Sequence, residues 1–331
     1  MARITEKENL MMVIRGEIPE FVPRLSIAQQ QVRPAFMQAK RTPDGGGQDI
    51  YGVSYVATRD TGGMALPVPN EFILDDVTKW RDVLHLPDLD EIDWETMAKH
   101  DLEKIDRNEY ALAMGAGGYF LPLMNMMGFT EGLCAMYEEP EAVIEMYEYM
   151  SEFDCKLARK IIQYYQPDIF TQGDDIATAN DPFVSMDMYR ELVKPYHMRT
   201  AAIAKEYGLP INMHYCGHCD VMVDDWVGYG VNMWNPAQVT NDLLGIKAKY
   251  GRSFVLAGCW DSQGPIAWPE ATEEQVKQAV RDCIDTYAPG GGFVFWASAY
   301  GAEDDIPMQN KIRWIQEEYD AYGRTFYQKH A

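Results

Sequence analysis

The apolar positions before residue 110 define few long elements. Residues 5–8 have the sequence of a helix capping box, and the helix that follows is expected to end at Gly16. Residues 28–70 have weak periodicity and include three consecutive glycines, at 45–47. Such a stretch is typical of long loops or of a lid over a site.

From residue 110 onward, short apolar runs alternate regularly with helical patterns. Strands are predicted at 110–114, 168–172, 210–214, 231–234, 253–257 and 293–296, and helices at about 119–136, 139–165, 185–207, 220–229 and 241–249, after Thr272, and at the end of the chain. This alternation predicts a parallel sheet. The sequence contains no Gly-x-Gly-x-x-Gly turn, which argues against a dinucleotide-binding fold. We therefore expect a single-domain α/β protein spanning 1–331, a (β/α)8 TIM barrel with an N-terminal extension and lid loops.

The composition excludes several classes of partner. The chain has 331 residues and a net charge of −22, so it lacks the basic face that nucleic acids or anionic membranes require. No run of about 20 apolar residues predicts a membrane span. The first residues are charged and lack a secretory apolar region, which favours a cytoplasmic protein. In that compartment the six cysteines are expected to be thiols or metal ligands. A homodimer is compatible with the sequence.

Polar side chains follow the predicted strands at the end where barrel enzymes place their active residues. They are Asp174, Asp175, His214, Cys216, Cys219, Asn235, Cys259, Asp261 and Tyr300. Asp174, Asp175 and His214 are candidates for general acid and base groups. For the two aspartates, capping of a helix N-terminus is an equally good interpretation.

The densest group of candidate ligands lies around residue 214. His214 and Cys216 share one face of a strand, Cys219 follows in a loop, and Cys259 ends a later strand. Imidazole and thiolate are ligands that Zn²⁺ prefers, and catalytic zinc sites use three of them with one open position. The competing interpretation is that these cysteines are small buried apolar residues.

Aromatic residues also gather near the strand ends. Trp260, Trp296 and Tyr300 are candidates for holding a planar substrate, with Asn235 and Asp261 as polar partners. Packing within the barrel is the alternative for the aromatic residues.

Several segments together resemble the uroporphyrinogen decarboxylase superfamily over nearly the whole chain. They include 8–10, 16–19, 128–132, 189–196, His214-x-Cys216-Gly217, Asn235-Pro236-x-Gln238 and 288–293. The resemblance implies a (β/α)8 barrel. True decarboxylases carry an Arg-Gln-Ala-Gly-Arg segment near the N-terminus, whereas residues 23–30 here lack it. The resemblance therefore favours the zinc methyltransferases that work with corrinoid proteins.

Two subsets of those methyltransferases are relevant. One has His-x-Cys plus a late cysteine, but residues 296–299 here contain no cysteine. The other demethylates aryl methyl ethers such as veratrol and resembles a pattern of an acidic residue, 27 residues, Cys, 39 residues and Cys. Glu191, Cys219 and Cys259 have that spacing. The resemblance to this subset implies these three as zinc ligands, with His214 next and Cys216 last.

The implied function is transfer of a methyl group from an aryl methyl ether to the Co(I) corrinoid of a partner protein, with Zn²⁺ as a Lewis acid. Two alternatives stay open. One is a methyltransferase that works in the opposite direction, from a corrinoid to a thiol. The other is a metal-free decarboxylase or pocket protein on the same barrel.

Overall fold

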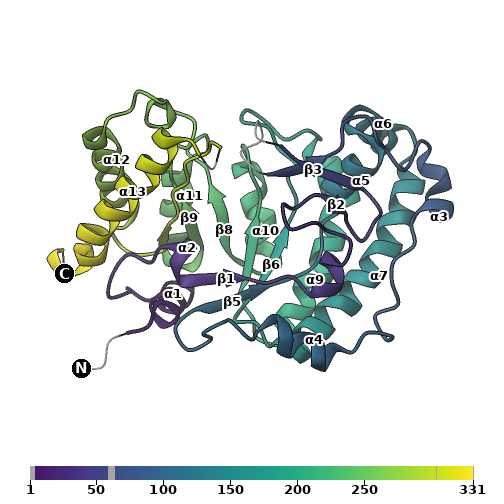
Figure 1. The fold of residues 1–331 in the computed structure, drawn as a ribbon, viewed down its shortest axis with the longest axis horizontal. Coiled ribbons are helices and arrows are strands. Elements are labelled where there is room, and N and C mark those ends of the chain that lie inside the picture. Colours follow the sequence, from purple (N-terminus) through teal and green to yellow (C-terminus); the bar gives the residue numbers. More distant parts are fainter. Residues whose placement is uncertain (1–3, 59–63, 303, 331) are drawn as a thin grey trace.

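Seven parallel strands form one curled sheet with helices around it (Figure 1). The computed structural model describes residues 4–58, 64–302 and 304–330. In sheet order the strands are β1 (Gln29–Gln31), β5 (Ala111–Met114), β6 (Ile169–Gly173), β7 (Ile211–His214), β8 (Val231–Ala237), β9 (Val255–Gly258) and β10 (Phe293–Phe295). This architecture confirms the predicted TIM-barrel-like α/β class, and the six strands expected after residue 110 are all present.

The predicted eighth strand is replaced by a shorter contact. Arg24 forms a single parallel bridge with Phe295, and the Phe295 N–H donates to the carbonyl oxygen of Pro23 at 2.8 Å. A short helix, α2 (Leu25–Ala28), then separates this segment from β1. The chain before β1 therefore contacts β10 on one side, and β1 itself pairs with β5 on the other.

The helices follow the strands as the alternation predicts. They are α1 (Glu6–Ile14), α3 (Trp80–Val83), α4 (Trp94–Asp101), α5 (Phe120–Met127), α6 (Phe129–Glu138), α7 (Pro140–Tyr165), α8 (Met186–Met188), the π-helix η4 (Tyr189–Val193), α9 (Lys194–Glu206), α10 (Val223–Tyr229), α11 (Leu243–Tyr250), α12 (Glu273–Tyr287), α13 (Ile306–Ala321) and α14 (Phe326–Lys329). None of them is long and apolar enough to cross a membrane.

Helix boundaries differ from the prediction where the backbone requires it. The expected helix at 119–136 divides at Gly128, whose φ of +84° cannot continue a helix. The helix expected after Thr272 is present, and Thr272 forms a complete capping box with Gln275 at its start. At the N-terminus only half a box forms: Thr5 accepts from the Glu8 N–H, but the Glu8 carboxylate pairs with Arg15 instead.

The described parts of the 28–70 segment, 28–58 and 64–70, are more ordered than the sequence suggests, and residues 59–63 lie outside the described residues. Within this stretch β2 (Gly47–Gln48), β3 (Ser54–Ala57) and β4 (Ala65–Pro67) form a small antiparallel sheet beside α5 (Figure 1). Asn125 of α5 donates to the Tyr55 hydroxyl at 3.1 Å, which fixes this sheet to the barrel. Part of the segment expected to form lid loops is therefore a sheet. Its strands are too short to show a clear alternation of apolar and polar residues in the sequence.

Apolar side chains fill the barrel near the N-terminal ends of the strands. The cluster comprises Leu10, Val13, Leu25, Ala28, Ala111, Ala113, Ile169, Met233, Val255, Ala257 and Val294, all buried. The Lys7 N–H donates to the Glu109 carbonyl oxygen just before β5, so α1 lies at the N-terminal ends of the strands. Since this end is filled by apolar residues, polar chemistry is left to the opposite end.

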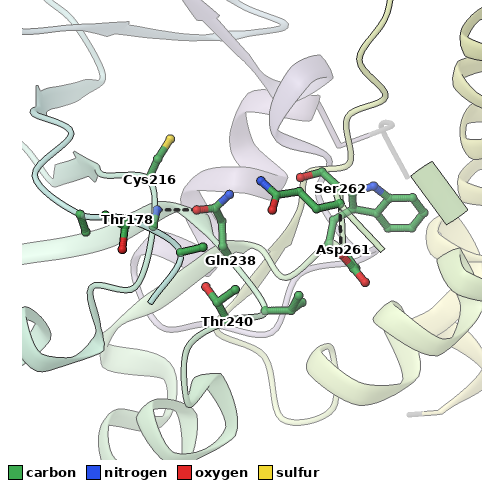
Figure 2. Close-up of a pocket in the computed structure, with 12 residues that line it drawn as sticks. Thr178, Cys216, Gln238, Thr240, Asp261 and Ser262 are labelled. Atoms are coloured by element: carbon green, nitrogen blue, oxygen red, sulfur yellow. Dashed lines mark hydrogen bonds between the residues drawn. The ribbon is translucent and has the colours of Figure 1, made fainter. Parts of the chain in front are cut away.

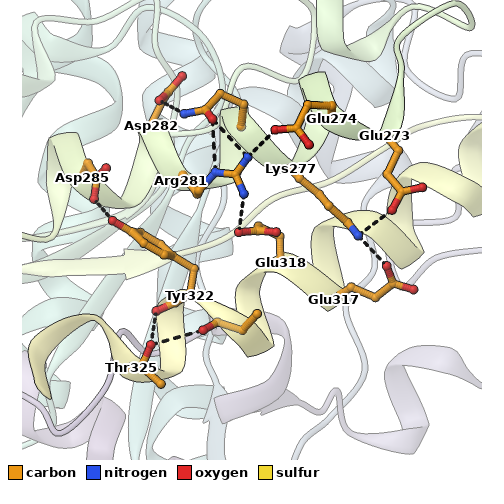
Figure 3. A network of polar contacts seen from close by, with 12 residues as sticks. Glu273, Glu274, Lys277, Arg281, Asp282, Asp285, Glu317, Glu318, Tyr322 and Thr325 are labelled. Atoms are coloured by element: carbon orange, nitrogen blue, oxygen red, sulfur yellow. Dashed lines mark hydrogen bonds and ion pairs between the residues drawn. The ribbon is translucent and has the colours of Figure 1, made fainter. Parts of the chain in front are cut away.

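Ion pairs connect α12 and α13 on the outside of the barrel (Figure 3). Lys277 pairs with Glu273 and Glu317, and Arg281 pairs with Glu274 and Glu318. Several of these carboxylates are well exposed, so each pair is worth at most about 1 kcal/mol.

A buried carboxyl group on α7 gives the fold a pH dependence. Asp154 is 3% exposed, and burial raises its pKa to about 7. A carboxyl whose pKa is raised by folding holds its proton more tightly in the folded chain. It therefore stabilises the fold at low pH, and this contribution is lost as the pH rises from about 4 to about 7.

We expect Asp154→Asn to flatten this dependence, because the amide stays neutral. Between pH 5 and pH 8 the free energy of unfolding of the parent should fall by about 2–3 kcal/mol more than that of the variant. Urea denaturation at both pH values measures the difference. Asp187→Asn, at a side chain 99% exposed, is the matched control and should behave like the parent. An identical pH dependence in all three proteins would contradict the assignment.

Candidate metal centre

Three candidate ligands meet at the C-terminal ends of β6 and β7. Asp175 lies two residues beyond β6, His214 is the last residue of β7, and Cys216 lies two residues further. One ligand atom from each of the three lies within 4.8 Å of the others. Within the described ranges no other three His, Cys, Asp or Glu side chains meet in this way. We call Asp175, His214 and Cys216 the triad.

The environment of the triad controls its protonation. Burial lowers the pKa of His214, and Arg33 acts in the same direction, while Asp175 and Asn235 oppose it. Burial raises the pKa of Cys216 to about 12, and the neighbouring Asp175 adds to the rise. At neutral pH the imidazole is therefore uncharged, and the thiol keeps its proton unless a cation displaces it. A carboxylate, an imidazole and a thiol form a donor set that fits Zn²⁺, with a fourth position left over.

The loops that carry the triad are joined by backbone contacts. The Cys216 N–H donates to Asp175 Oδ1 at 2.9 Å, and the His218 N–H donates to the Thr178 carbonyl oxygen at 2.7 Å. Gly217 has a φ of +94°, and a Cβ there would lie 2.5 Å from the Thr178 oxygen. Only glycine allows this approach, which holds Asp175 beside Cys216.

Asp174 has a capping role. Its carboxylate accepts hydrogen bonds from the backbone N–H groups of Tyr119, Phe120 and Leu121 at 2.7, 2.7 and 2.6 Å. These are the orphan donors at the start of α5, and the side chain is fully buried. Of the two interpretations left open by the sequence, the geometry matches capping for Asp174, whereas Asp175 joins the triad.

The ligand set implied by the acidic–Cys–Cys spacing is not brought together. Glu191 is exposed on η4. The Cys219 thiol is buried, 3.2 Å from the carbonyl oxygen of Cys216. Cys259 packs against α12, where the Cys283 thiol contacts its carbonyl oxygen at 3.2 Å, and burial raises the pKa of the Cys259 thiol.

A cavity of about 220 Å³ opens beside the triad. It is lined by Ala177, Thr178, Ala179, Cys216, Gly217, Gln238, Val239, Thr240, Trp260, Asp261, Ser262 and Gln263. Figure 2 shows Cys216 at one side of this cavity, Asp261 and Ser262 at the other, and the Cys216 thiol pointing away from Thr240. The lining offers hydroxyl and amide groups, the Cys216 thiol, the Asp261 carboxylate and one aromatic ring, and it contains no basic side chain.

The predicted substrate-binding residues lie in three places. Asn235 and Trp296 lie next to the triad: Asn235 Nδ2 is 3.3 Å from His214 Nδ1, and the rings of Trp296 and His214 are 6.4 Å apart. Trp260 and Asp261 line the cavity, where the Asp261 carboxylate also accepts from the Gly264 N–H at 2.7 Å. Tyr300 is 65% exposed and lines a smaller cavity, which shares Trp260 and Asp261 with the first.

Sequence reasoning missed residues that support the site without binding a ligand. Asn241 accepts from the N–H groups of Cys219 and Asp220 and donates to the Gly217 carbonyl oxygen, so it organises the loop after β7. Arg33 contributes positive charge near His214. Arg33 lies just beyond β1, and residues that follow parallel strands lie at the same rim of the barrel. This position is the only sequence signal that could have identified Arg33.

Comparisons with known proteins identify the family and the fold. The family model described as Uroporphyrinogen decarboxylase (URO-D) matches residues 66–316. No match is found among curated proteins. A methyltransferase from Methanosarcina mazei has a similar fold, with a TM-score of 0.62 and 14% identity, over 96% of this chain and 100% of that chain. A B12-independent methionine synthase from Shewanella sp. W3-18-1 aligns over 85% of this chain and 76% of that chain, with a TM-score of 0.39 and 10% identity.

Proposed function

Since this chain belongs to the uroporphyrinogen decarboxylase family, we propose that it is a zinc-dependent methyltransferase whose metal is held by the triad. The observation that best supports this proposal is that Asp175, His214 and Cys216 lie together at the rim where barrel enzymes place their active residues. A thiol ligand favours zinc over magnesium or calcium. The absence of the Arg-Gln-Ala-Gly-Arg segment makes porphyrinogen decarboxylation a weaker alternative.

We propose an aryl methyl ether as the methyl donor and the Co(I) corrinoid of a partner protein as the acceptor. The cavity beside the triad supports a small aromatic substrate, because Trp260 supplies a ring and Thr240 and Gln238 supply neutral polar groups. The Trp296 ring lies 6.4 Å from the His214 ring and offers a second aromatic surface next to the metal ligands. A lining with a carboxylate and no basic side chain disfavours an anionic donor, which is consistent with a neutral donor such as a dimethoxybenzene.

The chain's residues bind and orient the donor for an in-line transfer. The bound zinc would supply Lewis acidity toward the ether oxygen. Trp260 and Trp296 hold the ring, and Asn235 holds His214 in place. The O–CH3 bond breaks with its electron pair left on the oxygen, which gives a phenolate, and the corrinoid nucleophile supplies the pair for the new bond to the methyl carbon. The phenolate then takes a proton from solvent.

The test is methyl transfer by the zinc-loaded protein with 1,2-dimethoxybenzene and free cob(I)alamin. We expect the Co(I) absorbance to decay and 2-methoxyphenol to form, and His214→Ala to lose both. Methylcobalamin with a thiol acceptor is assayed in parallel. Faster turnover in that second assay would replace the proposed direction with the corrinoid-to-thiol alternative, and no turnover in either assay by protein that holds zinc would contradict methyl transfer.

A further inference from the structure

Two buried amides form a hydrogen-bonded chain that ends at His214. Asn212 of β7 is 1% exposed, and its Nδ2 donates to Asn235 Oδ1 at 2.6 Å. Asn235 of β8 is 6% exposed, and its Nδ2 lies 3.3 Å from His214 Nδ1. The strand register places His214 opposite Asn235, so the sheet itself fixes this contact.

The donor-to-acceptor direction of these hydrogen bonds decides which imidazole nitrogen of His214 carries the proton. A neutral imidazole has one N–H donor and one acceptor nitrogen. While the amide donates to Nδ1, the proton resides on Nε2, and that nitrogen cannot bind a cation. Ligation through Nε2 requires a proton on Nδ1 and an acceptor facing it. The Asn235 amide can supply that acceptor by turning over, which presents Oδ1 to His214 and Nδ2 to Asn212.

The end of this hydrogen-bonded series that lies away from His214 has the groups that such a reversal needs. Asn212 Oδ1 and Thr171 Oγ1 are both buried, and neither has a hydrogen-bond partner in the part of the chain that the structure describes. Thr171 of β6 is the register neighbour of Asn212. A hydroxyl group can donate or accept, directly or through a bridging water, so it can satisfy either orientation of the Asn212 amide.

We propose that Asn235, backed by Asn212 and Thr171, is the positioning residue that sets the tautomer of His214, and that its amide turns over when a cation binds the triad. This inference rests on the proposed metal centre. It assigns to Asn235 a role toward the ligand rather than toward the methyl donor.

The test compares Asn235→Asp with Asn235→Leu. Nitrogen NMR of the His214 ring reports the tautomer, and competition with a chelator reports the zinc affinity. We expect metal-free parent protein to carry the His214 proton on Nε2 and zinc-loaded protein to carry it on Nδ1. Asn235→Asp, whose carboxylate can only accept, should hold the proton on Nδ1 without metal and bind zinc at least as tightly. Asn235→Leu should bind zinc about 10–100-fold more weakly.

The inference is overturned if Asn235→Leu binds zinc like the parent, or if Asn235→Asp leaves the metal-free proton on Nε2. Thermal unfolding verifies that the variants are folded, and the isosteric aspartate variant carries the test if the leucine variant does not fold. The NMR comparison needs no metal, so it separates the two proposals. Parent protein that binds no zinc would sink the metal centre, whereas the aspartate result decides the role of Asn235 independently.

Discussion

Cys216→Ala should lose both zinc and methyl transfer, whereas Cys219→Ala should keep both. Zinc binds protein sites with about 10–16 kcal/mol, so one ligand accounts for roughly 3–4 kcal/mol, or about 150–800-fold in affinity. Cys216 is the only thiol in the triad. Cys219 lies only three residues further along the chain, but its buried thiol contacts the carbonyl oxygen of Cys216.

Elemental analysis of the purified variants, followed by chelator competition, measures this difference. Glu191→Gln is a second control, because the carboxylate is exposed and stands apart from the triad. Zinc retained by Cys216→Ala but lost from Cys219→Ala would reverse the assignment and restore the set favoured by spacing.

Neighbouring aspartates should give opposite phenotypes when each is replaced by alanine. Asp174→Ala removes the acceptor of three backbone N–H groups at the start of α5, two of them buried, and we expect it to cost about 3–5 kcal/mol of folding free energy. Asp175→Ala removes one hydrogen bond to the Cys216 N–H and should cost only about 1 kcal/mol. The metal should respond in the reverse order, because only Asp175 belongs to the triad.

Urea denaturation and zinc analysis of both variants test this pair. Asp174→Asn is a useful intermediate, because its amide oxygen can still accept from part of the α5 terminus. Equal losses of stability in the two alanine variants would contradict the capping role of Asp174.

The strand pattern was the most predictive part of the sequence. Apolar runs after residue 110 located every later strand of the sheet, and parallel strands place the residues that follow them at one rim. For this reason Asp175, His214 and Cys216 could all be selected as candidates before any coordinates. The antiparallel sheet in 28–70 could not be predicted, because its strands have two to four residues and show no period.

Ligand identity was harder to predict, because spacing along the chain says nothing of side-chain direction. Gly258 and Cys259 both have positive φ values, of 132° and 57°, and the chain there leaves the regular course of β9. The carbonyl oxygen of Cys259 contacts the Cys283 thiol of α12, and Cys259 is buried there. Glu191 lies on an exposed helical face. Both outcomes depend on local backbone conformation, which the spacing of 27 and 39 residues does not encode.

The most direct test of the metal centre is X-ray absorption spectroscopy at the zinc edge on the zinc-loaded parent protein. The triad predicts one sulfur at about 2.3 Å and two or three nitrogen or oxygen ligands at about 2.0–2.2 Å. Two sulfur ligands would contradict it and point back to Cys219 and Cys259. A zinc shell without sulfur, or protein that takes up no zinc, would remove Cys216 from the site and the proposed function with it.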